Sequence, residues 1–272
     1  ELSKDDFNLG NHDLNDYDIN TYYLDVLLDE ENDKLYVEGE IIYVNDKTDF
    51  DELYLTLYPN SKERAFVSNN VDIDYIKING IEVEYEITGE DYSQINIELD
   101  ETLEEGSNFT IEFKYEFEYW HFQSRIMVVD DYYLTMFFYP FVSIFDDEGW
   151  NIDPFTLHGE SYYNDIGDYF VSLDVRDDFL VASSGKLLFE ESSNGRLNKY
   201  LYLENGRDFS FSTSPNYYHY DSEMDGRLFE IYSIRELSSI EVEDSLRYME
   251  DTFHLFEGYV GEYYYDYFTL EY

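Results

Sequence analysis

Histidines are the first residues to examine for metal binding or proton transfer. The chain has five: His12, His121, His158, His219 and His254. None begins a His-Glu-x-x-His pair, and no two have the helical spacing of paired metal ligands. His158, beside Gly159, could be a ligand or an acid–base group, or it could be structural. The histidines therefore predict no zinc site, and no catalytic residue is assigned.

Other catalytic motifs are also absent. No Gly-x-Ser-x-Gly elbow occurs, and Ser184-Gly185-Lys186 lacks the earlier glycine of a phosphate-binding loop. The absence of cysteine excludes disulfides, thiolate zinc sites and a cysteine nucleophile. With 63 acidic residues, paired carboxylates arise by chance. The run Asp146–Glu148 offers oxygen ligands for calcium but lacks the helix–loop–helix calcium spacing, so a solvated turn is the alternative.

The densest aromatic segment runs from Tyr132 to Tyr169 and contains two of the four prolines. In one interpretation its rings fill the core of a β-sandwich. In the other they line a pocket or face a second domain, and should then be partly exposed. The candidate cleft or interface residues are Phe138, Tyr139, Trp150 and His158.

The formal net charge of −47 restricts the possible partners. This charge argues against nucleic acid as a partner and disfavours anionic membrane surfaces, because binding to either needs a cationic protein surface. The acids are spread along the whole chain, which favours adaptation to high salt over one cation site. No apolar run approaches the length of a membrane span. The compartment stays undetermined, and we expect an extracellular or cell-surface protein of a high-salt organism rather than a cytoplasmic one.

The elements that must position these residues are mainly short strands. Aromatic and β-branched residues alternate with acids between regular turn signals, as in sandwiched or saddle-shaped antiparallel sheets. The clearest hairpin joins Val71–Ile78 to Ile81–Ile87 through Asn79-Gly80, with one face buried and one acidic. The other predicted strands are Thr21–Asp29, Leu35–Val44, Glu52–Tyr58, Gln94–Leu99, Asn108–Tyr119, Phe170–Val175, Phe179–Ser183, Lys186–Glu190, Lys199–Leu203 and Asp208–Ser214.

The pattern changes near Pro215. Leu228–Ile234 predicts a strand, Ser239–Tyr259 an amphipathic helix capped by Ser238 or Ser239, and Tyr264–Tyr272 a final strand. We therefore expect a poorly ordered segment at 1–20, a β domain at 21–215, and at 216–272 the start of a truncated α/β domain. The final strand, without a partner of its own, predicts an edge-to-edge dimer.

The order of short motifs resembles the N-terminal domain of the gluzincin zinc aminopeptidases, the family of aminopeptidase N and leukotriene hydrolase, and especially its bacterial branch. The matching pieces are Tyr22–Val26, Val37–Gly39, Ile42–Asn45, Leu55–Asn60, Ile76–Gly80, Tyr139-Pro140, Asp146 with Gly149-Trp150, Gly159, Asp168-Tyr169, Val181-Ala182, Gly185, Arg207–Ser212, and a helix with Leu246, Tyr248, Phe253, Phe256 and Gly258. Together they cover about residues 20–272.

This resemblance implies a saddle-shaped β domain that walls the cleft of a thermolysin-like domain. It also implies a parent enzyme that removes N-terminal residues from peptides with one Zn²⁺ held by two histidines and a glutamate. The family's Gly-x-Met-Glu-Asn and His-Glu-x-x-His segments are absent here, so this chain is expected to bind no catalytic zinc and to need the rest of its polypeptide. The family's substrate-amine contact, a Gln or Glu, has no counterpart between Val128 and Phe138.

A stand-alone β-sandwich module for carbohydrate or protein adhesion is the alternative. Trp150 and Tyr162-Tyr163 would then form a sugar platform. The helix and strand at 239–272 distinguish the two hypotheses, because a sandwich module has no use for them.

Overall fold

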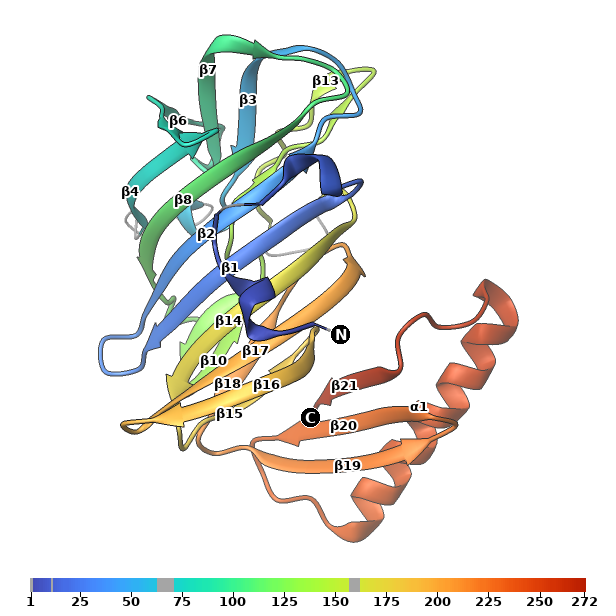
Figure 1. Cartoon of the computed structure of the whole chain (residues 1–272). Helices are drawn as coiled ribbons and strands as arrows, with labels where there is room; N and C mark the ends of the chain where they lie inside the picture. The colour runs from blue at the N-terminus through green and yellow to red at the C-terminus, as the bar shows by residue number, and fades with distance from the viewer. Residues whose placement is uncertain (1, 11, 63–70, 157–161) are drawn as a thin grey trace.

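The computed structural model describes residues 2–10, 12–62, 71–156 and 162–272 (Figure 1). It confirms a mainly β chain with several antiparallel sheets and one helix near the C-terminus. Strand β18 (Phe211–Ser214) ends just before Pro215, and strand β19 (Tyr218–Met224) begins just after it. The sheets thus divide where the sequence pattern changes.

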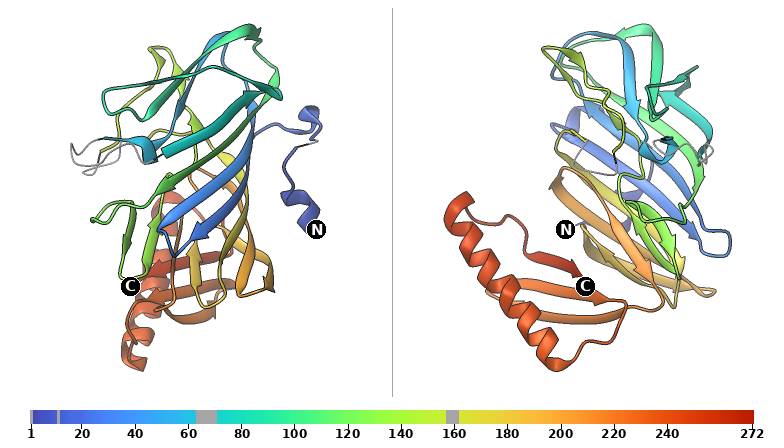
Figure 2. Two further views of the ribbon diagram at one scale, coloured as in Figure 1. Left: turned by 90° about the vertical axis from the view of Figure 1, so that its left-hand side faces the viewer. Right: turned by 180° about the vertical axis from the view of Figure 1, so that it is seen from behind.

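A twisted sheet of eight strands forms one side of the β domain (Figure 2). In spatial order its strands are β16 (Lys186–Ser193), β17 (Arg196–Gly206), β14 (Gly167–Arg176), β1 (Asn20–Asp29), β2 (Lys34–Val44), β8 (Asn108–Glu118), β4 (Val71–Ile78) and β5 (Ile81–Glu82). All neighbours are antiparallel except β1 and β14, which run parallel from Asn20 opposite Gly167. The strand after the central aromatic stretch therefore joins the sheet beside the first strand of the domain.

Smaller sheets enclose the core with this large one. One contains β15 (Leu180–Ser183), β18, β10 (Tyr132–Thr135) and β9 (Ile126–Val129), and another contains β11 (Phe141–Val142), β3 (Phe50–Thr56), β7 (Gln94–Leu103) and β6 (Glu86–Thr88). A third is the short pair β12 (Phe145–Asp146) and β13 (Gly149–Trp150). A 3-10 turn at Tyr58–Asn60 follows β3.

Alternation along the strands builds the core. In β1 the inward side chains are Tyr22, Leu24, Val26 and Leu28, and in β8 they are Phe109, Ile111, Phe113, Tyr115 and Phe117. Between these strands Gly39 of β2 leaves room for a ring, because a Cβ there would lie 2.5 Å from Cζ of Phe113. The sheet thus needs glycine at this position.

The C-terminal unit is a small sheet covered by a helix. Strands β19, β20 (Arg227–Ser233) and β21 (Tyr267–Glu271) form the sheet, and α1 (Ser239–Val260) runs along one side of it (Figures 1 and 2). Ser238 caps α1 in a capping box with Glu241, as the sequence predicts. Phe229, Ile231 and Met249 are the buried centre of a separate small core.

Three sequence expectations differ from the structure. The last strand is not unpaired, because β21 pairs in parallel with β20. The hairpin at Asn79-Gly80 forms, but its second strand is only Ile81–Glu82, and Ile81 is 71% exposed. The chain then leaves this sheet and enters another as β6, so the predicted buried face does not include Ile81.

The segment before β1 is the third difference. The sequence predicts poor order there, but the described residues include two 3-10 turns, Lys4–Phe7 and Leu14–Asp16. Phe7 is buried against the rings of Phe170 and Tyr200. The segment is also held on the large sheet by the side-chain amide of Asn108, which donates to the carbonyls of Leu14 and Tyr17. Ring packing and hydrogen bonds together thus dock this Asp- and Asn-rich stretch.

Within the described residues, no helix combines the length and apolar character needed to cross a bilayer.

Candidate functional site

The C-terminal unit docks on the β domain through β21. The Glu271 carboxylate accepts hydrogen bonds from Tyr132 (2.8 Å) and from Ser212 of the neighbouring β18. Tyr267 donates to the carbonyl of Ser184 at 2.8 Å, and Lys186 pairs with Asp266 at 2.6 Å. Polar groups from both units thus converge along one strand.

A cavity of about 570 Å³ lies between the two units. The β domain contributes Leu134, Met136 and Asp208 to its wall, and the C-terminal unit contributes Tyr265 and Phe268. The cavity is mostly apolar and has a few charged groups on its wall, which is the usual character of a small-molecule or peptide site. Residues of both units therefore line this cavity.

Asp208 is the notable titratable group of this cavity. Burial raises the pKa of its carboxyl from 3.8 to about 7, while hydrogen bonds from Tyr139 and from the Phe209 backbone oppose the rise. The Tyr139 hydroxyl donates to Asp208 at 3.1 Å and accepts from the Phe209 amide at 3.1 Å. The predicted site residue Tyr139 therefore holds the Asp208 carboxyl by a hydrogen bond, but it is not one of the residues that line the cavity.

The expectation of partly exposed aromatic residues in the central stretch is wrong for most of them. Phe138 and Tyr139 are buried, with exposures of 0% and 1%. Tyr139 packs edge-on against Tyr22 (5.4 Å) and Tyr169 (5.6 Å), and Phe138 packs against Phe211. Rings at successive positions of this stretch fill the core because the chain leaves regular strand geometry at Phe137, where φ is +53°. Their assignment to a cleft or interface remains a prediction.

Trp150 lies elsewhere. It is half-buried on the β12–β13 pair, and its ring packs against Phe50 (4.7 Å), Phe145 (5.1 Å) and Tyr54 (5.8 Å). In the acidic turn before it, the Asp146 carboxylate accepts the backbone amide of Glu148 at 2.9 Å. That bond is typical of a self-stabilised turn. His158 lies outside the described residues. Of the other three predicted site residues, Trp150 packs against a different set of rings from Phe138 and Tyr139.

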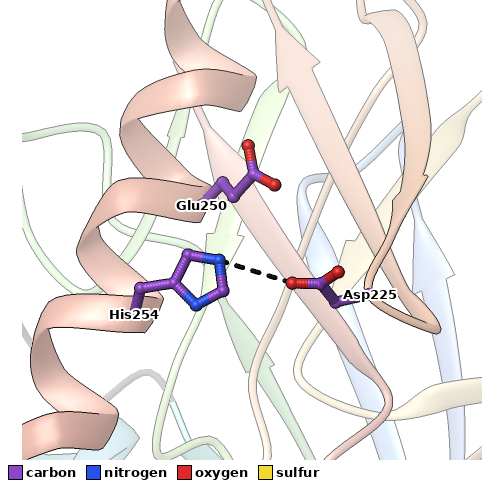
Figure 3. A group of neighbouring side chains, drawn as sticks. All are labelled: Asp225, Glu250 and His254. Carbon is purple, nitrogen blue, oxygen red and sulfur yellow. Dashed lines mark ion pairs between the residues drawn. The ribbon is translucent and has the colours of Figure 1, made fainter.

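One further group of side chains has the composition of a metal site. Asp225, Glu250 and His254 offer ligand atoms that all lie within 4.8 Å of one another (Figure 3). Sequence reasoning missed this group because Asp225 comes from a turn and Glu250 is one of many acids. The four-residue spacing of Glu250 and His254 on a helix was the available signal.

The described residues do not fit the catalytic zinc that the sequence resemblance implies for the parent. Such a site needs two histidines and a glutamate, whereas this group has a single histidine. Asp225 and His254 are moreover exposed. No hydrolytic step is therefore assigned to these residues.

Comparisons with known proteins bear on the fold. No protein-family model matches the chain, and no curated protein matches it. Among solved structures, a two-domain M1 zinc metallopeptidase variant bound to L-arginine aligns with a TM-score of 0.61 and 11% identity over 93% of this chain. The M1 zinc metallopeptidase from Deinococcus radiodurans aligns with a TM-score of 0.59 and 11% identity, also over 93% of this chain.

The alignments cover only 56% and 55% of those two chains, so this chain spans little more than half of their length. At such low identity the likeness concerns the three-dimensional fold. It extends over nearly the whole chain and so includes both the β domain and much of the C-terminal unit. The fold of this chain is that of part of an M1 zinc metallopeptidase.

Proposed function

We propose that this chain is the non-catalytic N-terminal part of a zinc-dependent metallo-aminopeptidase. Its β domain supports the substrate cleft, and residues 216–272 begin the catalytic domain. The observation that carries the proposal is a fold likeness to M1 zinc metallopeptidases that covers 93% of this chain but only about half of theirs. An isolated sandwich module would match only over the β domain.

The junction between the two units supports the cleft role. Hydrogen bonds to Glu271 and from Tyr267 hold β21 against β15, β18 and β10, and the cavity opens beside them. A β domain fixed in this way gives a rigid wall to whatever chain continues the C-terminal sheet. Binding sites between units depend on such rigid positioning.

The chemistry itself is assigned to residues downstream of this chain. When bound, zinc activates water for attack on a peptide carbonyl. The two histidines and the glutamate that hold it in the family have no counterpart in this sequence. The substrates of the parent are then peptides with a free N-terminus, and the partner of this chain is the remaining catalytic domain of the same polypeptide.

The test compares two proteins. The purified 272 residues should not hydrolyse aminoacyl-anilides with or without added Zn²⁺. The longer product of the gene should hydrolyse them, and a chelator should abolish its activity. Hydrolysis by the shorter protein, or an inactive longer product without downstream zinc ligands, would overturn the proposal.

A glycan array with the same protein addresses the adhesion module. The proposal expects no specific hits, since the Trp150 ring already packs against three other rings. A clear glycan ligand that is lost in Tyr163→Ala, which removes a half-exposed ring, would favour a binding module instead.

A further inference from the structure

Three potential metal ligands meet at one corner of the C-terminal unit. Asp225 lies in the two-residue turn between β19 and β20, while Glu250 and His254 lie on α1 (Figure 3). Nε2 of His254 is 3.3 Å from Oδ2 of Asp225. The Glu250 carboxylate completes a group in which every ligand atom lies within 4.8 Å of the others.

The local backbone brings these side chains together. Residues four apart on a helix lie one above the other, so Glu250 and His254 share a face of α1. Asp225 (φ +52°) and Gly226 (φ +74°) have the left-handed conformations of a tight hairpin turn. This turn places the Asp225 side chain opposite the helix.

Neighbouring contacts fix the helix against the hairpin. Arg227, at the start of β20, pairs with Glu257 one turn beyond His254, at 2.6 Å. The rings of Phe229 and Phe253 meet edge-on at 5.1 Å. The three ligands are therefore carried by elements that are already packed together, which lowers the ordering cost of binding an ion.

The geometry suits a tetrahedral ion. With bonds of about 2.0–2.1 Å, the edge of a tetrahedral zinc site is about 3.3–3.4 Å long. The observed separation of the Asp225 oxygen and the His254 nitrogen is 3.3 Å. The Glu250 carboxylate, whose ligand oxygen lies within 4.8 Å of both groups, would be the third ligand of an ion between them, with water as the fourth.

The ligand chemistry selects the class of ion. Calcium and magnesium prefer sites made only of oxygen, whereas one imidazole with two carboxylates suits a first-row transition ion. The net charge of −47 raises the local concentration of any divalent cation. We propose that Asp225, Glu250 and His254 bind one Zn²⁺-like transition-metal ion, which joins the β19–β20 turn to α1 and stabilises the C-terminal unit.

The test is a calorimetric titration of the full chain with Zn²⁺ in a buffer that contains excess Mg²⁺ to occupy scattered carboxylates. We expect one tight equivalent of Zn²⁺. The variants His254→Ala, Asp225→Asn and Glu250→Gln should each weaken it roughly 100-fold or more, beyond the loss typical of an outer-shell partner. Asp225 and His254 are more than half exposed, so their loss leaves the fold intact.

His121→Ala is the matched control. That histidine also faces one carboxylate, Asp33, at 3.6 Å, but belongs to no three-ligand group among the described residues. It should leave Zn²⁺ binding unchanged. Added Zn²⁺ should also raise the melting temperature of the unsubstituted chain but not that of His254→Ala. No tight equivalent, or a tight equivalent that persists in His254→Ala, would overturn the proposal.

Discussion

Replacing Asp208 by asparagine should remove a pH dependence that is built into the junction cavity. The folded carboxyl keeps its proton up to about pH 7, whereas in the unfolded chain it ionises near its ordinary pKa of 3.8. Between these values the folded state binds more protons, so its stability falls as the pH rises through this window and is constant above it. The amide of the Asp208→Asn variant would carry no charge at any pH, and its oxygen could still accept the Tyr139 hydroxyl.

The magnitude follows from the width of the window. About three pH units at roughly 1.4 kcal/mol each give an upper limit of about 4 kcal/mol. Asp208 lines an open cavity, where water softens the cost of burying a charge, so we expect about half of this, roughly 2 kcal/mol. Asp208→Asn and the unsubstituted chain should have similar free energies of unfolding at pH 4, and the variant should be more stable at pH 8.

Urea unfolding of both proteins at pH 4, 6 and 8 in molar salt measures the effect. The other acids contribute equally to both proteins, so the difference between them isolates Asp208. Glu262→Gln, which changes an exposed acid of the C-terminal unit, is the control and should show no such trend. If the free energies of unfolding of the unsubstituted chain and Asp208→Asn differ by the same amount at all three pH values, the reasoning is refuted.

Three further predictions concern the sheet, the junction and the charge. Gly39→Ala should destabilise the chain by about 1–3 kcal/mol in urea, since its Cβ would meet Phe113 at 2.5 Å and the Tyr23 carbonyl at 2.9 Å; an unchanged midpoint would contradict this packing. Glu271→Ala should speed hydrogen exchange in β21 but not in β2, because it removes the acceptor shared by Tyr132 and Ser212; equal exchange in both proteins would argue against this contact. The melting temperature should rise between low and molar salt as self-repulsion is screened, and a flat dependence would remove the high-salt hypothesis.

Local signals predicted the strands well where residues alternate. β1, β2, β8 and α1 lie within a residue or two of their predicted bounds. β19 was missed because Tyr218–Met224 is mostly polar and lies on a small, half-exposed sheet. Its turn, Asp225-Gly226, was a usable hairpin signal.

Sheet membership could not be predicted from local pattern. The parallel pairing of β1 with β14 depends on contacts between Asn20–Leu27 and Gly167–Asp174, and alternation does not say which distant strand is the neighbour. The same limit applies to the candidate site. Phe138 and Tyr139 were recognised as unusual, but their burial depends on rings from other strands, such as Tyr22 and Phe211.

The parallel pairing also constrains how the chain can fold as it leaves the ribosome. β1 and β2 are made early, but the other edge of β1 stays unpaired until β14 has been made. A long sheet edge therefore stays open while the residues between β1 and β14 are made, and contacts this distant in sequence close slowly. The acids of β1 and β2 that alternate with core residues, such as Asp25, Glu38 and Glu40, would then repel other nascent chains during that interval.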